Sequence, residues 1–226
     1  MNPKADVSRP FVTAPSVSAP YAPGVLKAEY VQDGLNALNF YRYIAGLPDD
    51  VTATAELNES AAYGSVLLAS KGVFAHTQKQ PADMAKDFYD KGIASTSTAN
   101  IFASFGYNNH SLVSSIEAYM QDSDTANLDK LGHRRWLLNP PLKNVGMGLA
   151  VGKDEFTYSA LQVFDKSRSE RVNYHYIPYP ARGAFPAEVF GATTAWSVSV
   201  NPDEYAAPAE SAVKVTLTRL RDNKSW

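Results

Sequence analysis

The first half of the chain has the spacing of apolar residues that is typical of helices. In four segments they recur every three or four positions, so they share one face of a helix. Glycines just beyond the first three segments suit helix ends, because glycine readily adopts the left-handed conformation that terminates a helix. The predicted helices, mainly scaffold for a core, cover residues 29–45, 54–70, 81–91 and 111–121.

The period changes to two after a short helical segment that carries His133. Apolar residues alternate with small or polar ones at 145–151 and again at 156–160, which is typical of strands. Residues 152–155 read Gly-Lys-Asp-Glu and would form the turn of a β-hairpin. Helices first and antiparallel strands later predict an α+β fold with an antiparallel sheet.

The two ends of the sequence differ from this middle part. Residues 1–27 contain five prolines, which disfavour a helix and suit an extended arm or linker. Residues 166–226 are rich in Tyr and Pro and include two strand-like runs, 195–200 and 212–220, so we expect a small β-rich extension. Because the second run lies near the last residue, we expect this unit to continue in the full-length protein. The main domain would then span residues 28–165.

The composition and charge of the chain argue against several classes of function. With 226 residues and 45% hydrophobic residues the chain can bury a real core. A net charge of −2 and the lack of long basic runs argue against a nucleic-acid partner. No apolar run approaches the roughly 18–20 residues of a membrane span. The absence of cysteine excludes disulfides and thiolate chemistry, and is compatible with a cytosolic or an exported protein.

Several motifs carry a family resemblance. Residues 132–140 read Gly-His-Arg-Arg-Trp-Leu-Leu-Asn-Pro and are followed by Val-Gly-Met-Gly at 145–148. Upstream, residues 39–47 fit an Asn-x-x-Arg-x-x-x-Gly-Leu pattern, residues 72–76 end in histidine, and Asn-Ile stands at 100–101. In order and spacing these motifs resemble the CAP superfamily of cysteine-rich secretory proteins, antigen 5 and pathogenesis-related 1 proteins, and its bacterial SCP-like extracellular members. The resemblance implies a CAP-type α-β-α sandwich over residues 28–165.

The resemblance also implies a cleft with two histidines, which fall on His76 and His133. Ala99 stands where the family usually has a cleft glutamate, so one expected acid is missing. By position Asp122 is the nearest replacement for the second family acid, and Glu117 is the other carboxylate in reach. These four ionisable residues are the candidates for the cleft.

Two neutral imidazoles can bind a divalent metal such as zinc, but a defined site usually needs a third ligand or several waters. Asp122, Asp124 or Glu117 could complete a site with His76 and His133; otherwise the histidines are hydrogen-bonded structural residues. Hydrolysis would further require an activated base or nucleophile, and the chain has neither a Gly-x-Ser-x-Gly elbow nor a His-Glu-x-x-His helix. We therefore favour a non-catalytic protein.

The sequence and the resemblance together predict a secreted, extracellular or cell-wall-associated bacterial binding module. Its ligand, a protein, a glycan of the cell wall or a lipid, would occupy the two-histidine cleft or the exposed loops. One alternative is a metal-assisted hydrolase acting on cell-wall or peptide substrates. Another is a lipid or sterol carrier with an apolar groove between the first and fourth helices, since fold does not determine function.

Three other features have two interpretations each. His110 precedes the helix at 111–121 and suits its start better than it suits a ligand role. Of Arg134 and Arg135, one would contact a carboxylate of the core or of a helix end, and the other would be a solvated charge. The alternative is that they bind an anion. His175 lies within the Tyr-rich stretch 174–179, which would form either an interdomain contact or a surface for a glycan or peptide.

Overall fold

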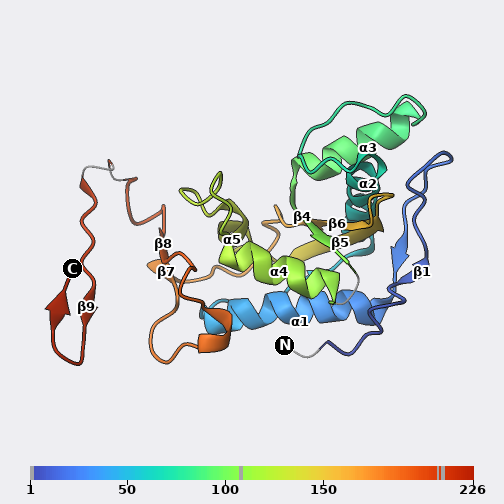
Figure 1. Cartoon of the computed structure of the whole chain (residues 1–226). Helices are drawn as coiled ribbons and strands as arrows, with labels where there is room; N and C mark the ends of the chain where they lie inside the picture. Colours follow the sequence, from blue (N-terminus) through green and yellow to red (C-terminus); the bar gives the residue numbers. More distant parts are fainter. Residues whose placement is uncertain (1–2, 107–108, 208, 210–211) are drawn as a thin grey trace.

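The computed structural model describes residues 3–106, 109–207, 209 and 212–226. A four-stranded sheet of order β3-β5-β6-β4 lies between helices on its two faces (Figure 1). Strands β5, β6 and β4 are antiparallel, and β3 pairs with β5 in parallel. The predicted α+β fold of CAP type is confirmed. The helices are α1 (Ala28–Ile44), α2 (Ala55–Lys71), α3 (Lys86–Ser97), α4 (Ser111–Gln121) and α5 (Gly132–Leu137), and the strands are β3 (Thr52–Ala53), β4 (Ala99–Phe105), β5 (Asn144–Val151) and β6 (Phe156–Gln162).

Each face of the sheet has its own buried core. Residues of α1, α4 and α5 pack on one face, and residues of α2 and α3 pack on the other. The alternation along β5 explains this division, because its larger apolar residues face α1 and α4 while its glycines face α2. A Cβ on Gly146 or Gly148 would lie 2.1 or 2.2 Å from backbone atoms of Leu57 or Ala61 in α2. The glycines therefore let α2 lie directly against the sheet.

Three of the four predicted long helices are confirmed, at α1, α2 and α4. The N-cap of α2 is Thr54, whose side chain accepts a hydrogen bond from the backbone of Leu57 at 3.2 Å. The third prediction is wrong at both ends, since α3 begins at Lys86 and continues through Gly92. Gly92 does not end the helix; a Cβ there would lie 2.9 Å from the side chain of Leu67, so this glycine serves close packing of α3 on α2.

The predicted hairpin is confirmed at β5 and β6. The sequence analysis missed β4, which follows α3 after Thr98 without the Gly or Pro residues that usually separate elements. It also missed β3, which has only two residues and gains its place by pairing with β5.

The N-terminal residues lie against the sandwich. Strands β1 (Phe11–Thr13) and β2 (Val25–Leu26) form an antiparallel ribbon beside the start of α1 (Figure 1). The backbone N–H groups of Lys4 and Ala5 donate to the buried carboxylate of Asp33 at 2.7 and 2.8 Å. These contacts tie the segment to α1.

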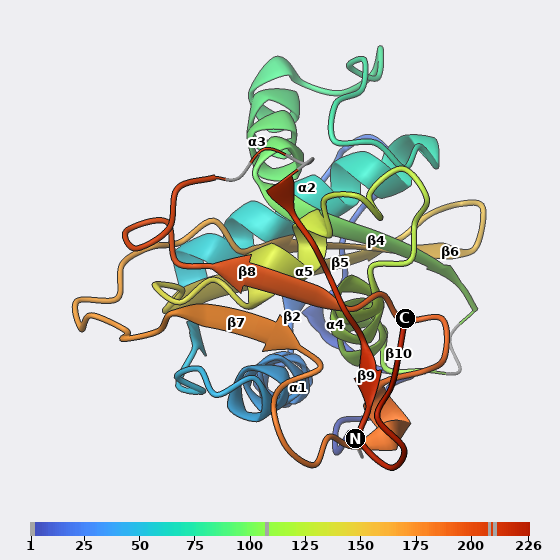
Figure 2. The same ribbon diagram turned by 90° about the vertical axis from the view of Figure 1, so that its left-hand side faces the viewer.

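The C-terminal residues, called the C-terminal unit below, add a small pair of strands whose Ile177 and Tyr179 join the core on the α1 and α4 side of the sheet. Strands β7 (Tyr176–Tyr179) and β8 (Ser197–Val200) are antiparallel neighbours, which confirms the strand expected at 195–200, and Figure 2 views the side on which they lie. A 3-10 turn, η1 (Ala187–Val189), lies between them. The strand predicted over 212–220 is wrong for most of its length, because only β9 (Thr218–Arg219) is paired, with β10 (Lys224–Ser225). This hairpin stands away from the sandwich (Figure 1).

Candidate functional site

His133 lies in the first turn of α5, where its imidazole is fixed by a carboxylate. Its Nδ1 is 2.8 Å from Oδ1 of Asp122 and 3.0 Å from the amide nitrogen of Asn127. Because a carboxylate only accepts, Nδ1 is the donor in the contact with Asp122. The ring also stacks on Tyr119 of α4, with 5.4 Å between centroids. The side chain is 24% exposed, so part of it remains open to solvent.

Asp122 is itself held firmly. It ends α4 in the left-handed conformation, with φ of 48°, and it is buried. Its second oxygen accepts from the backbone N–H of Arg134 at 3.1 Å, and the amide of Asn127 donates to the oxygen that His133 also contacts. Asp122, which by position is the nearest replacement for the second family acid, therefore faces His133.

Glu117 has different surroundings. It lies on α4, and its charge acts on Tyr41 of α1: burial first, and then the charges of Tyr179 and Glu117, raise the pKa of Tyr41 above its ordinary value. This influence indicates that Glu117 is close to α1. Asp122 is thus the better-supported carboxylate of the histidine site.

His76 lies in the connection between α2 and α3 and is exposed. Its Nδ1 is 2.7 Å from the carbonyl oxygen of Thr96, and the hydroxyl of Thr96 donates to the carbonyl oxygen of His76 at 2.6 Å. A carbonyl only accepts, so Nδ1 is again the donor and Nε2 is the remaining ring nitrogen. Both candidate histidines therefore present the same ring nitrogen.

The position of the missing family acid is part of the core. Ala99, the first residue of β4, is buried in the cluster that packs under α2 and α3. Beside it, the amide of Asn100 donates to the carbonyl oxygen of His133 at 3.1 Å and so links β4 to α5. The register places Gln162 of β6 opposite Ala99, and the Gln162 amide donates to the carbonyl and hydroxyl oxygens of Ser95 at 3.1 and 2.8 Å.

Sequence reasoning missed Gln162. The one available signal was a polar residue between Leu161 and Val163 in an apolar strand. A buried polar side chain in such a place is usually hydrogen-bonded, as this one is.

The donors found here do not complete a metal site. Within the described ranges, no group of three or more His, Cys, Asp or Glu side chains is placed to hold a metal ion. Asp122 is engaged by His133 and Arg134, and the carboxylate of Asp124 accepts from the backbone of Ala126 in an exposed loop. A metal bound by the two histidines would need its remaining donors from water or a ligand. Metal binding by His76 and His133 stays a prediction.

His110 is a structural residue, as its place in the sequence predicts. Its side chain caps α4 by accepting from the backbone of Val113 at 3.4 Å, and its ring stacks on Tyr30 at 3.7 Å. Burial lowers the pKa of His110 below 6.5 and outweighs the opposing effect of Asp33, whose carboxylate is 3.5 Å away.

Arg134 and Arg135 differ in burial and in their hydrogen bonds. Arg135 is exposed, whereas Arg134 is buried and donates to the carbonyls of Met120 and Gln121 at the end of α4. The helix-end role expected for one arginine thus belongs to Arg134.

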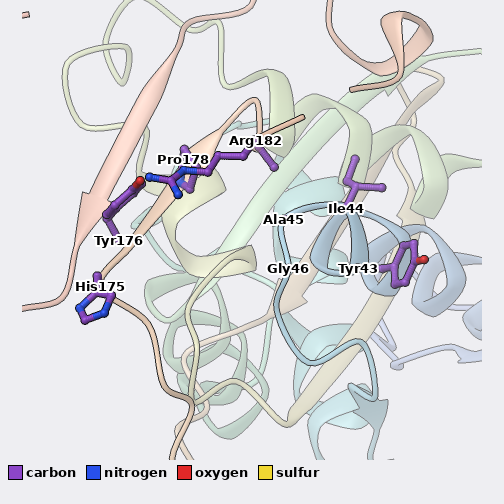
Figure 3. Close-up of a pocket in the computed structure, with 9 residues that line it drawn as sticks. Tyr43, Ile44, Ala45, Gly46, His175, Tyr176, Pro178 and Arg182 are labelled. Carbon is purple, nitrogen blue, oxygen red and sulfur yellow. The ribbon is translucent and has the colours of Figure 1, made fainter. Parts of the chain in front are cut away.

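A hollow of about 380 Å³ lies between the end of α1 and β7 (Figure 3). The guanidinium of Arg182 lies 5.0 Å from the ring centroid of Tyr176, and His175 is hydrogen-bonded to Glu204. The tyrosines near His175 do not form one surface, because Tyr176 lines this hollow while Tyr179 is buried. The lining residues are Tyr43, Ile44, Ala45, Gly46, His175, Tyr176, Pro178, Ala181 and Arg182.

The sheet with helices on both faces fits the α+β fold of a CAP-type domain. The sequence model of CAP, the cysteine-rich secretory protein family, matches residues 35–164, and the chain belongs to this family. The comparison with curated proteins gives no match. Proteins of the CAP family are generally extracellular. In the described part of the chain, none of the helices has the length and apolarity needed to cross a membrane.

Proposed function

We propose that this protein is a secreted or cell-surface binding module that holds an extracellular ligand at the cleft around His133 and His76. The observation that carries the proposal is the pairing of His133 with the buried Asp122, which orients the ring through Nδ1 while the side chain stays 24% exposed. A ring held in one tautomer offers a ligand a defined acceptor and loses little entropy on binding. Extracellular ligands of three kinds fit the proposal: proteins, cell-wall glycans and lipids.

The geometry favours binding over catalysis. Ala99 supplies no acid where the family usually has one, and it is enclosed in the core. Asp122 already accepts from three groups, including the amide of Asn127. A general acid or base must reach the reacting proton, and Asp122 is fully engaged in holding His133.

Co-sedimentation with purified peptidoglycan tests the proposed binding. We expect wild type to pellet with the wall material, and His133→Ala and Asp122→Asn to pellet at least about tenfold less, since each removes the fixed acceptor. His175→Ala is the matched control, because His175 is exposed and belongs to the C-terminal unit. Equal sedimentation of wild type and His133→Ala would refute this use of the cleft, provided that circular dichroism shows both folded.

Zinc titration tests the metal prediction separately. Chelator-treated wild type, His76→Ala, His133→Ala and the double variant would be compared by calorimetry. If the two histidines are metal ligands, binding at one zinc per chain is lost in each variant and kept in His175→Ala. Equal zinc affinity in wild type and the double variant would reject both histidines as ligands.

A metal-assisted hydrolase remains the main alternative. The observation in its favour is the carboxylate–histidine pair, because such a pair orients an imidazole whose Nε2 can accept a proton. Incubation with peptidoglycan and with unstructured peptides tests it by product analysis. We expect no turnover; cleavage that His133→Ala abolishes would instead make the protein an enzyme.

Lipid carriage is a second alternative, but at a cavity other than the groove expected between the first and fourth helices. Between the first and fourth helices, Tyr30 packs directly on α4 and its hydroxyl accepts from the backbone of Ser111 at 3.0 Å. An apolar cavity of about 390 Å³ lies instead between residues 23–26, Val31 of α1, the start of α2 and Met147. Mild purification followed by lipid mass analysis tests carriage at this cavity, and recovery of no lipid would count against it.

A further inference from the structure

A cavity of about 330 Å³ lies where α5 and the residues after it meet the C-terminal unit. Its volume is at the lower end of the range for small-molecule sites. Neither candidate histidine belongs to its lining, although Gly132 and Arg135 of the same helix as His133 do. The lining residues are Gly132, Arg135, Trp136, Leu138, Asn139, Pro140, Lys166, Tyr174, Ile177, Ser199, Val200 and Pro202.

The charge on this lining is positive. Arg135 and Lys166 supply two cations, and the lining contains no carboxylate. Among the ion pairs of the described residues, neither of these two side chains has an acidic partner within 4 Å. Two cations at one cavity without an acid in its wall favour an anionic ligand.

Acidic residues lie near the Tyr174 side of the cavity. Burial first, and then the charges of Asp203 and Glu204, raise the pKa of Tyr174. Glu204 also forms a hydrogen bond with Nδ1 of His175. Because both acids would oppose an anion near Tyr174, the Arg135 and Lys166 side is the favoured place for a negative charge.

The remaining lining suits a ring with hydroxyl groups. Trp136 and Tyr174 are aromatic, and one face of Trp136 is covered by Phe164 at 3.9 Å between centroids. Ser199 and Asn139 add a hydroxyl and an amide, which can donate to and accept from ligand hydroxyls. We propose that this cavity binds an acidic sugar, with the carboxylate at Arg135 and Lys166 and the ring against the aromatic side chains.

The cavity exists only because the C-terminal unit docks on the domain. Arg135 and Trp136 come from α5, whereas Ser199 and Val200 come from β8. The neighbouring Arg134 connects the same two elements by donating to the hydroxyl of Ser197 at 3.0 Å. The inference therefore assigns a ligand to the junction between the two units.

Ligand-detected NMR with the whole chain tests this inference. Glucuronate is the acidic probe, glucose is its neutral match, and glucose 6-phosphate separates carboxylate from phosphate recognition. We expect glucuronate to bind at least tenfold more tightly than glucose and to weaken as salt is raised, because exposed charges are screened. A tenfold difference corresponds to about 1.4 kcal/mol, which is reasonable for charge-assisted hydrogen bonds.

Variants locate the binding. Arg135→Ala with Lys166→Ala should lose glucuronate binding about tenfold or more, and because both side chains are exposed the fold should be kept. Lys153→Ala, which removes one exposed charge from the β5–β6 turn, should bind as wild type does.

Equal binding of glucuronate and glucose, or unchanged binding in the double variant, would overturn the proposal. Preference for glucose 6-phosphate over glucuronate would overturn the carboxylate assignment.

Discussion

The sandwich and the C-terminal unit differ in how they bury their apolar side chains. In the sandwich, both faces of the sheet are covered by helices, and the side chains of Leu38, Leu67 and Val145 are fully buried. In the C-terminal unit, Ile177 and Tyr179 are buried in the core that α1 and α4 share, whereas Val215 and Leu220 near the end are 83% and 89% exposed. Burial of apolar area is the main stabilising contribution to a fold. The sandwich therefore buries most of its own apolar surface, whereas the C-terminal unit buries its apolar residues only where they pack on the sandwich.

Docking combines the apolar contacts of Ile177 and Tyr179 with polar contacts around Arg134. Its guanidinium donates to Ala195 and Ser197 of the C-terminal unit and lies 4.6 Å from the ring centroid of Tyr179. Tyr179 is buried and packs edge-on against Phe185. Changes in the sandwich should thus unfold the molecule, while changes at Arg134 should separate its two parts.

The largest effect is expected for Gly148→Ala. The added Cβ would lie 2.2 Å from the backbone of Ala61, and neither β5 nor α2 can move without disturbing both cores. We expect a loss of at least about 3 kcal/mol in the free energy of unfolding, measured by urea denaturation. Gly191→Ala in the C-terminal unit is the control, because nothing but the Thr194 hydroxyl lies within 4 Å of its Cβ. A loss below about 1 kcal/mol at Gly148 would contradict the close helix–sheet contact.

Arg134→Met should have the next largest effect. It removes the donors that satisfy the carbonyls of Met120, Gln121 and Ala195, and unsatisfied buried acceptors cost about 1–3 kcal/mol each. We expect a loss of about 3–5 kcal/mol and faster proteolysis within residues 166–226.

Arg135→Met, at the neighbouring exposed position, should change stability by no more than about 0.5 kcal/mol. If Arg134→Met left the proteolysis pattern unchanged, the C-terminal unit would not depend on this arginine.

His110 should make the sandwich sensitive to mild acid. Burial lowers its pKa below the ordinary 6.5, so the unfolded chain binds a proton at a higher pH than the folded chain does. Stability is therefore lost as the pH falls through about 6.5 and further until the folded histidine is protonated. In His110→Asn, which keeps a good N-cap, the decrease in Tm between pH 7 and 5.5 should be smaller than in wild type.

The matched variant is His175→Asn. His175 is 70% exposed, and its removal should leave the acid sensitivity from His110 in place. An identical pH dependence of Tm in wild type and His110→Asn would show that the buried imidazole does not cause it.

The smallest effect on stability is expected for Val215→Thr. This side chain is 83% exposed, so the change should alter the free energy of unfolding by less than about 0.5 kcal/mol. It should also reduce self-association at high protein concentration, because exposed apolar surface promotes aggregation. Light scattering measures the second effect, and Val145→Thr in the core gives the contrast, with an expected loss above about 1 kcal/mol. Comparable losses at both positions would contradict the division between the two units.

Local patterns determined much of this protein. Helical spacing located α1, α2 and α4, alternation located β5 and β6, and the motif around His133 indicated the CAP family, which the family model confirms. These features depend on neighbours in sequence, where periodicity and capping act directly. The family resemblance, rather than periodicity, made Asp122 a candidate by its position, and the structure places it against His133.

Tertiary structure decided what depends on distant partners. Gly92 suggested a helix end, but its role is set by Leu67 of another helix. Residues 212–220 alternate like a strand, yet most of them have no strand beside them with which to exchange hydrogen bonds. The roles of Gln162 and Arg134 likewise follow from Ser95 and Ala195, far away in the chain. Sequence fixes a residue's own propensity, while its hydrogen-bond partners and packing neighbours are fixed only when the folded chain brings them together.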